Sequence, residues 1–239
     1  MTNITETWAR STVRHTPDPE IPAYLENTYW WAYVRPAAIA FWDRSWLVNL
    51  ILFGNFRRLR DAALAEFDPA NTGSTLQISC VYSDITPKLA GRVTRRGSLD
   101  IVDVVPAQLE NVSRKLRGFE RVRTLRRNAA ALKFADASYD QALLFFLLHE
   151  VPDDLKGKVL SEALRVVKPG GKLVIVDYDR PSILHPLRPL LYLVLKLLEP
   201  FALVLWGRSL TSWLPKDRVD GFDRKTYFGG MYQKIVVQV

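Results

Sequence analysis

The stretch "LQISCVYSDITPKLAGRV" (residues 76–93) predicts a buried strand, a tight turn and the start of a helix. In α/β enzymes, this element commonly cradles a nucleotide-like cofactor at the N-terminus of the helix. The glycines expected in such a turn are missing. The stretch therefore predicts an α/β fold whose cofactor site has either been lost or been rebuilt for other chemistry.

Strand and helix patterns alternate after residue 75. The strand candidates are 75–81, 99–104, 121–127, 139–147 and 171–178, and the helix candidates are 85–92, 106–116 and 152–166. This alternation favours a mostly parallel sheet with helices on both faces. "KPGGK" (168–172) predicts a turn that leads into the last of these strands, and Gly229 and Gly230 within 226–239 predict an antiparallel C-terminal hairpin.

Two apolar regions flank this core. Aromatic and aliphatic residues at helical spacing in 21–67 predict a helical cap. In 184–207, Arg188, Lys196 and Glu199 would lie on one arc of a single helix, which Pro200 is expected to end. Such an amphipathic pattern is typical of a helix that lies on a membrane surface, covers an apolar substrate or packs against the sheet. We divide the chain into a lead-in and aromatic cap (1–70), an α/β core (71–182), an amphipathic lid or membrane-contact insertion (183–215) and a hairpin (216–239).

Composition narrows the class of protein. With 239 residues, 48% of them hydrophobic, the chain can bury one large core. The net charge is +8, but the basic residues are scattered along the chain and do not form the signature of a nucleic-acid module, so we expect no nucleic-acid partner. An acidic lipid surface would explain the positive charge as well as a nucleic acid would. A single cysteine, Cys80, and an N-terminus without an apolar signal favour a reducing compartment.

The strand order and "RVVKPGGKLVIVD" (165–177) resemble the class I S-adenosylmethionine (SAM) methyltransferases, particularly those acting on quinone precursors. Where that family carries Gly-x-Gly-x-Gly after the first strand, this chain carries Ser79, Val81 and Ser83. The resemblance implies a SAM site whose binding residues are Ser79, Val81, Ser83, Asp103, Val104, Asn128 and Ala129. Asp103 would accept the ribose hydroxyls; alternatively it caps the next helix.

His149 and Asp177 follow the fourth and fifth predicted strands. Because the carboxyl ends of neighbouring parallel strands face one crevice, the two side chains are expected to converge there. An imidazole with a carboxylate suits a divalent metal such as Mn²⁺, although either residue can instead be a satisfied structural group.

Several segments sharpen the resemblance: "YWWAYVRP", "VYSDITPKLA", "LLFFLLHE", "VDYDRPSILHPLRP" and "YFGGMYQK" are similar to the rhodoquinone biosynthesis proteins. That family implies transfer of the SAM amino group to ubiquinone with Mn²⁺, replacing a ring methoxy group. The implied catalytic residues are Tyr82, Asp84 and His149, the metal ligands are His149 and Asp177, and the quinone contacts are Tyr178, His185, Tyr29 and Trp30. Ubiquinone's isoprenoid tail implies a cytoplasmic enzyme held peripherally at the inner, respiratory membrane.

Two other functions fit the sequence. One is conventional SAM-dependent methylation of a quinone or lipid, and the other is a non-catalytic binding subunit that has lost SAM. The retained Asp103 argues against the second, because a dead site needs no ribose carboxylate.

Overall fold

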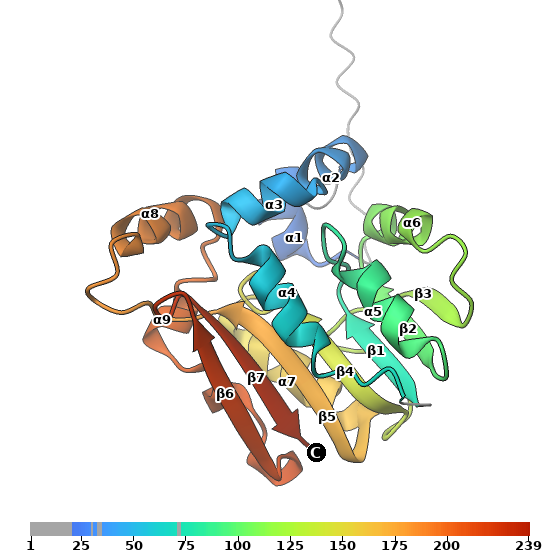
Figure 1. The fold of residues 1–239 in the computed structure, drawn as a ribbon. Helices are drawn as coiled ribbons and strands as arrows, with labels where there is room; N and C mark the ends of the chain where they lie inside the picture. Colours follow the sequence, from blue (N-terminus) through green and yellow to red (C-terminus); the bar gives the residue numbers. More distant parts are fainter. Residues whose placement is uncertain (1–20, 30, 33–34, 71–72) are drawn as a thin grey trace, which may run out of the picture.

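A seven-stranded mixed sheet of order β3-β2-β1-β4-β5-β7-β6 forms the centre of the protein (Figure 1). The structure is a computed structural model that describes residues 21–29, 31–32, 35–70 and 73–239. The strands β1 to β5 pair in parallel and β7 pairs antiparallel with both β5 and β6. The predicted α/β class, with its parallel core and antiparallel C-terminal strands, is confirmed.

The parallel strands are β1 (Ser74–Ile78), β2 (Ser98–Asp103), β3 (Val122–Arg126), β4 (Tyr139–Phe145) and β5 (Val167–Tyr178). Strands β1 and β4 and the second half of β5 (173–178) are almost continuously buried, as expected for strands covered on both faces. The connecting helices are α5 (Ile85–Val93), α6 (Pro106–Lys115) and α7 (Asp153–Val166). Crossovers of this kind bring the loops after β1, β2, β4 and β5 to one end of the sheet.

Short helices precede β1: α1 (Ala23–Thr28), α2 (Pro36–Trp42), α3 (Ser45–Ile51) and α4 (Phe56–Leu64). Helix α4 lies on the same face of the sheet as α5, whereas α7 lies on the opposite face (Figure 1). Helices α2 and α3 sit at the end of the sheet where the parallel strands terminate (Figure 1). The aromatic cap therefore lies over the end of the sheet expected to carry the site.

The segment between β5 and β6 forms α8 (Arg188–Leu198), α9 (Val204–Gly207) and short 3₁₀ turns at Leu210–Trp213 and Lys216–Arg218. Leu191 and Leu195 of α8 are buried, whereas Leu193 and Leu197 are 52% and 70% exposed. The outer face of α8 is therefore largely apolar. Nowhere in the described ranges is a helix both long and apolar enough to cross a bilayer.

The sequence predicts that Glu199 shares a polar helical arc with Arg188 and Lys196, and for Glu199 this prediction is wrong. Helix α8 ends at Leu198, just before Pro200, so the helical rotation no longer applies to Glu199. One carboxylate oxygen of Glu199 is buried instead of facing solvent with Lys196.

The C-terminal hairpin consists of β6 (Gly221–Tyr227) and β7 (Tyr232–Gln238), as predicted. Its turn contains positive φ angles at Phe228, Gly229 and Gly230. A Cβ atom on Gly229 would lie 2.3 Å from a ring carbon of His185, so this turn packs directly on the segment that leads to α8.

Candidate active site

Two adjoining cavities open at the carboxyl end of the parallel strands. The first has a volume of about 140 Å³ and the second about 440 Å³. Cys80, Gln108 and Glu150 line both cavities and so form the boundary between them. A smaller compartment and a larger one thus meet at the turn after β1.

Five of the residues predicted to bind SAM line the first cavity: Ser79, Asp103, Val104, Asn128 and Ala129. The Asp103 carboxylate accepts hydrogen bonds from the backbone N–H groups of Cys80 (2.7 Å) and Val105 (2.9 Å). Burial raises the pKa of Asp103, and these backbone hydrogen bonds oppose the rise. Each carboxylate oxygen keeps a further lone pair, so Asp103 can brace the turn and still accept a ribose hydroxyl.

The turn after β1 has kept a glycine-like backbone without glycine. Ser79 and Ser83 have φ angles of +80° and +70°, in the left-handed region that glycine adopts freely and other residues adopt at a cost. The chain therefore follows a glycine-type path at two positions that carry serine side chains.

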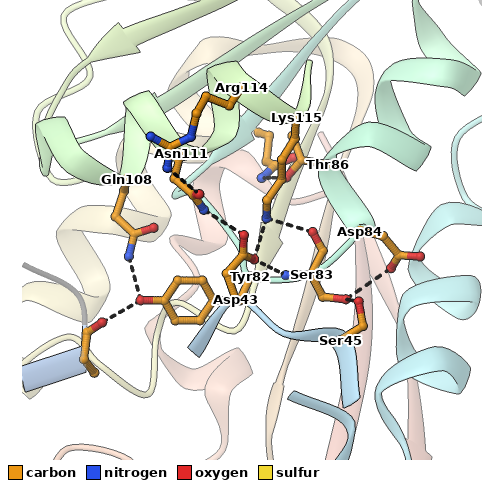
Figure 2. Close-up of polar contacts among 12 residues, drawn as sticks. Asp43, Ser45, Tyr82, Ser83, Asp84, Thr86, Gln108, Asn111, Arg114 and Lys115 are labelled. Atoms are coloured by element: carbon orange, nitrogen blue, oxygen red, sulfur yellow. Dashed lines mark hydrogen bonds and ion pairs between the residues drawn. The ribbon is translucent and has the colours of Figure 1, made fainter. Parts of the chain in front are cut away.

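Val81 and Ser83 do not line the first cavity. Val81 faces the second cavity, and Ser83 is buried under the cap (Figure 2). The Ser83 N–H donates to Asp43 (2.6 Å), and its hydroxyl donates to the Ser45 hydroxyl (2.8 Å). Lys115 of α6 donates to both Asp43 and the Ser83 carbonyl. Hydrogen bonds therefore connect the turn after β1 to the cap and to α6.

Tyr82 lies in the wall of the second cavity. Its hydroxyl donates to the Ala32 carbonyl (2.6 Å) and accepts from the Gln108 amide (3.1 Å) (Figure 2). Burial raises the pKa of Tyr82, which makes the residue a poor base and a good structural link to the cap.

The second cavity is lined largely by aromatic and aliphatic side chains. The cap contributes residues such as Trp31, Trp42 and Phe56, α8 contributes Leu190, Val194 and Leu198, and the sheet contributes Phe145, Phe146 and Tyr178. The polar side chains His149, Glu150 and Glu199 reach the same space. Such a cavity suits a planar apolar ring that carries a few polar substituents.

His149 and Asp177 meet, but not as a metal site. His149 Nδ1 lies 3.0 Å from Asp177 Oδ1, and Asp177 also accepts the backbone N–H groups of Leu148, His149 and Tyr178. Asp177 is fully buried and its oxygens are occupied by these donors, so it orients the imidazole. In this arrangement Asp177 has no lone pair left for a metal ion. Across the described ranges, no three His, Cys, Asp or Glu side chains form a metal-binding group, and the implied Mn²⁺ finds no site there.

The charges around His149 strongly raise its pKa. Burial alone would lower the pKa of His149, but Asp177, followed by Glu199 and Glu150, raises it to about 9. His149 is 4% exposed, and Tyr178 packs edge-on against its ring at 4.9 Å between ring centroids. A fixed imidazolium therefore stands in the wall of an apolar cavity at neutral pH.

Other predicted site residues lie elsewhere. Asp84 is paired with Arg60 at 2.7 Å and lines neither cavity, so it is not placed to act as a base. His185 accepts the backbone N–H of Leu187 through Nδ1 (3.2 Å) and packs on Phe228, also outside both cavities. Tyr29 is fully buried against Phe201, and Trp30 lies outside the described residues.

Sequence reasoning did not place Glu199, Gln108, Cys80 or Glu150 at the cavities. The available signal for Glu199 was a single carboxylate directly before a proline at the end of an apolar helix. A charged residue at that position either faces solvent or lines a cavity, and the sequence alone favoured a side chain that faces solvent.

The strand order and the cofactor cavity define a class I SAM-methyltransferase fold. Solved structures agree: the PH0226 protein from Pyrococcus horikoshii has a TM-score of 0.61 at 15% identity, covering 91% of this chain and 99% of that one. A SAM dependent methyltransferase from Aquifex aeolicus has a TM-score of 0.54 at 19% identity, covering 85% and 97%.

Residues 43–217 match the ubiE/COQ5 methyltransferase family, and the chain belongs to that family. It is 30% identical over 170 residues to the demethylmenaquinone methyltransferase of Bacillus velezensis, covering 70% of this chain and 72% of that protein. It is 28% identical over 190 residues to that of Bacillus subtilis, covering 78% and 80%. The chain is accordingly a SAM-dependent transferase of a quinone-modifying family.

Proposed function

We propose that the protein converts ubiquinone to rhodoquinone by transferring the amino group of SAM to the quinone ring in place of a methoxy group. One observation carries the proposal: the turn after β1 keeps its glycine-like path but places Val81 and Tyr82 toward the quinone cavity. Side chains there obstruct a sulfonium methyl aimed at that cavity. A re-aimed methionyl group would present its α-amino group instead.

The proposed reaction balances without an external oxidant. The neutral amine adds to the ring carbon that carries the methoxy group, and an electron pair moves onto a quinone oxygen. As the pair returns, the C–O bond breaks, and methoxide takes a proton from nitrogen and leaves as methanol. Loss of the Cα proton then reduces the ring by two electrons and gives an imine, and water hydrolyses the imine to an aminohydroquinone and a 2-oxo acid.

The second cavity supplies what this reaction needs from the chain. Its apolar walls exclude water, which strengthens any interaction with developing charge. The His149 imidazolium, oriented by Asp177, can donate a hydrogen bond from Nε2 to the quinone oxygen that gains charge. No step is assigned to a metal, because the described residues offer no ligand set.

The surface around this cavity supports docking at a lipid surface. Exposed apolar residues of α2 and α3 include Phe41, Trp46, Leu50 and Ile51, and those of α8 include Leu190, Leu193, Leu197 and Leu198. Leu50, Ile51, Leu190 and Leu198 also line the cavity, so the apolar surface leads into it. We propose peripheral binding to the cytoplasmic face of the respiratory membrane, with the isoprenoid tail remaining in lipid.

Methyl transfer to a quinone is the second candidate. It is favoured by the relatives of this chain that are named demethylmenaquinone methyltransferases. Both reactions use the same two cavities, so labelled SAM distinguishes them directly.

The test uses SAM carrying ¹⁵N at the amino group and ¹³C at the methyl group, with a short-tailed ubiquinone or demethylmenaquinol. We expect ¹⁵N, and no ¹³C, in an aminoquinone product detected by mass spectrometry. ¹³C in the quinone, with no ¹⁵N, would establish methyl transfer and overturn the proposal. Absence of both labels together with no calorimetric SAM binding would identify a binding subunit.

Asp103→Asn is the matched control for the cofactor cavity. Loss of a charge-assisted hydrogen bond to ribose costs roughly 1.5–3 kcal/mol, so SAM should bind about 10- to 100-fold more weakly. The identity of the transferred label should not change, because Asp103 holds the cofactor at its ribose end.

A further inference from the structure

Glu199 carries a buried carboxylate oxygen, Oε2, that makes no close hydrogen bond to a described residue, although the Tyr29 hydroxyl lies near enough to the carboxylate to lower its pKa. An unpaired buried acceptor commonly costs 1–3 kcal/mol, and more for a charged group, so such an atom calls for an explanation. Glu199 is not part of any structural ion pair within the described ranges, and it lines the second cavity. Glu199 therefore brings a carboxylate that has no ion-pair partner among the described residues to the wall of that cavity.

His149 lines the same cavity and is electrostatically coupled to Glu199. The Glu199 carboxylate is among the charges that raise the pKa of His149. Burial raises the pKa of Glu199, while His149 and Tyr29 lower it and Asp177 raises it. One residue comes from the end of β4 and the other from the end of α8, so the pair faces the cavity from two different elements.

Glu150 is the other carboxylate in the cavity, and it stands at the boundary with the cofactor cavity. Its Oε1 lies 3.6 Å from His149 Nε2, and it also lines the cofactor cavity. The Asp177 oxygens already accept hydrogen bonds from backbone N–H groups and from His149 Nδ1. Among these carboxylates, Glu199 has the oxygen that is both buried and unsatisfied.

We propose that Glu199 is the proton acceptor of this cavity and that His149 is its cationic partner, which hydrogen-bonds the quinone oxygen. The proposal rests on the proposed function in one respect, that a quinone ring occupies the cavity. It adds a catalytic residue from the insertion after β5, outside the SAM-binding strands and loops.

The proton balance is simple. The SAM ammonium gives one proton to Glu199, and the freed lone pair on nitrogen forms the C–N bond. The electron pair displaced from the ring moves onto the oxygen held by His149. When methoxide leaves, it takes a second proton from nitrogen, and protonated Glu199 releases its proton to solvent. If the chain instead methylates a hydroquinone, the same carboxylate accepts the ring proton lost when the new C–C bond forms.

The first test is Glu199→Gln, which keeps the shape and removes proton acceptance. General-base catalysis contributes roughly 10²- to 10⁴-fold, so kcat should fall by that factor while the KM for quinone stays within about threefold. Glu110→Gln is a matched carboxyl-to-amide exchange on exposed α6 and should keep full activity. Unchanged kcat in Glu199→Gln would overturn the proposal.

The second test does not depend on turnover. The chain has three histidines, so ¹⁵N-histidine NMR can follow His149, identified by the signal lost in His149→Gln. Removing the Glu199 charge should lower the pH midpoint of His149, because that charge favours the imidazolium. An unchanged midpoint would show that the pair does not exist. If wild-type protein transfers neither label, the proposed function has failed, and the NMR result still decides on the pair.

Discussion

Ser79 and Ser83 adopt left-handed backbone conformations that glycine adopts more easily than serine. Left-handed φ values cost a non-glycine residue about 1 kcal/mol or more, and such strain clusters at functional sites. Ser83 offsets its cost through hydrogen bonds to Asp43, Ser45 and Lys115, whereas Ser79 faces the cofactor cavity. The strain at Ser79 is therefore the clearer sign of selection for a function.

Replacing Ser79 with glycine should stabilise the fold. Relief of the φ of +80° is expected to raise the free energy of unfolding by about 1 kcal/mol and the Tm by roughly 2–4 °C, measured by calorimetry. Ser113→Gly, within helix α6, should instead lower the Tm, because glycine is a poor helix former. A lower Tm for Ser79→Gly would mean that the hydroxyl contributes more than the strain costs.

At the level of single residues, the sequence could place strand-end groups and little else. Asp103 and Asn128 follow strands, and parallel topology alone brings them to one cavity. Asp84 pairs with Arg60, 24 residues earlier, and no local sequence pattern reports that pairing. The environment of the Glu199 carboxylate depends on how α8 packs against the core, and the spacing of residues in the sequence does not report that packing.

At the level of elements, hydrophobic periodicity predicted the core strands and their connecting helices closely, because each element buries a continuous apolar face. The apolar segment 184–207 was harder, since the same pattern describes a helix on lipid and a helix on a sheet. The structure shows that α8 is apolar on both its inner and outer faces. Leu191 and Leu195 anchor it inward, and Leu193 and Leu197 are left for a partner.

Membrane binding by α8 is tested with the double variant Leu193→Gln/Leu197→Gln. Loss of two exposed leucines that would be buried in lipid should weaken sedimentation with anionic phospholipid vesicles by at least about tenfold. Phe222→Gln removes an exposed apolar side chain from the start of β6, which pairs with the end of β7 away from Tyr178, and should leave vesicle binding unchanged. Equal vesicle binding by the double variant and wild type would count against α8 as the contact.

At the level of the whole molecule, the buried imidazolium links stability to pH. The pKa of His149 is about 9 in the folded protein and 6.5 when unperturbed, so its stabilising contribution is full below pH 6.5 and is lost as pH rises through 9. The loss is on the order of 3 kcal/mol by the same linkage.

Urea unfolding between pH 6 and 10 measures this linkage. Wild-type stability should decline across pH 6.5 to 9, and His149→Gln should show a flatter profile over that interval. Parallel profiles for the two proteins would contradict a raised folded-state pKa. The difference between proteins, and not either profile alone, isolates His149 from other titrating groups.

Helix α8 carries outward leucines along its length and Glu199 directly after its last turn. A displacement of this helix would carry the carboxylate away from His149, which is fixed to the sheet by Asp177. The acid–base pair is therefore complete only while α8 is seated against the core. Under the proposed function, this arrangement suits interfacial activation, in which contact with lipid both delivers the quinone and assembles the groups that act on it.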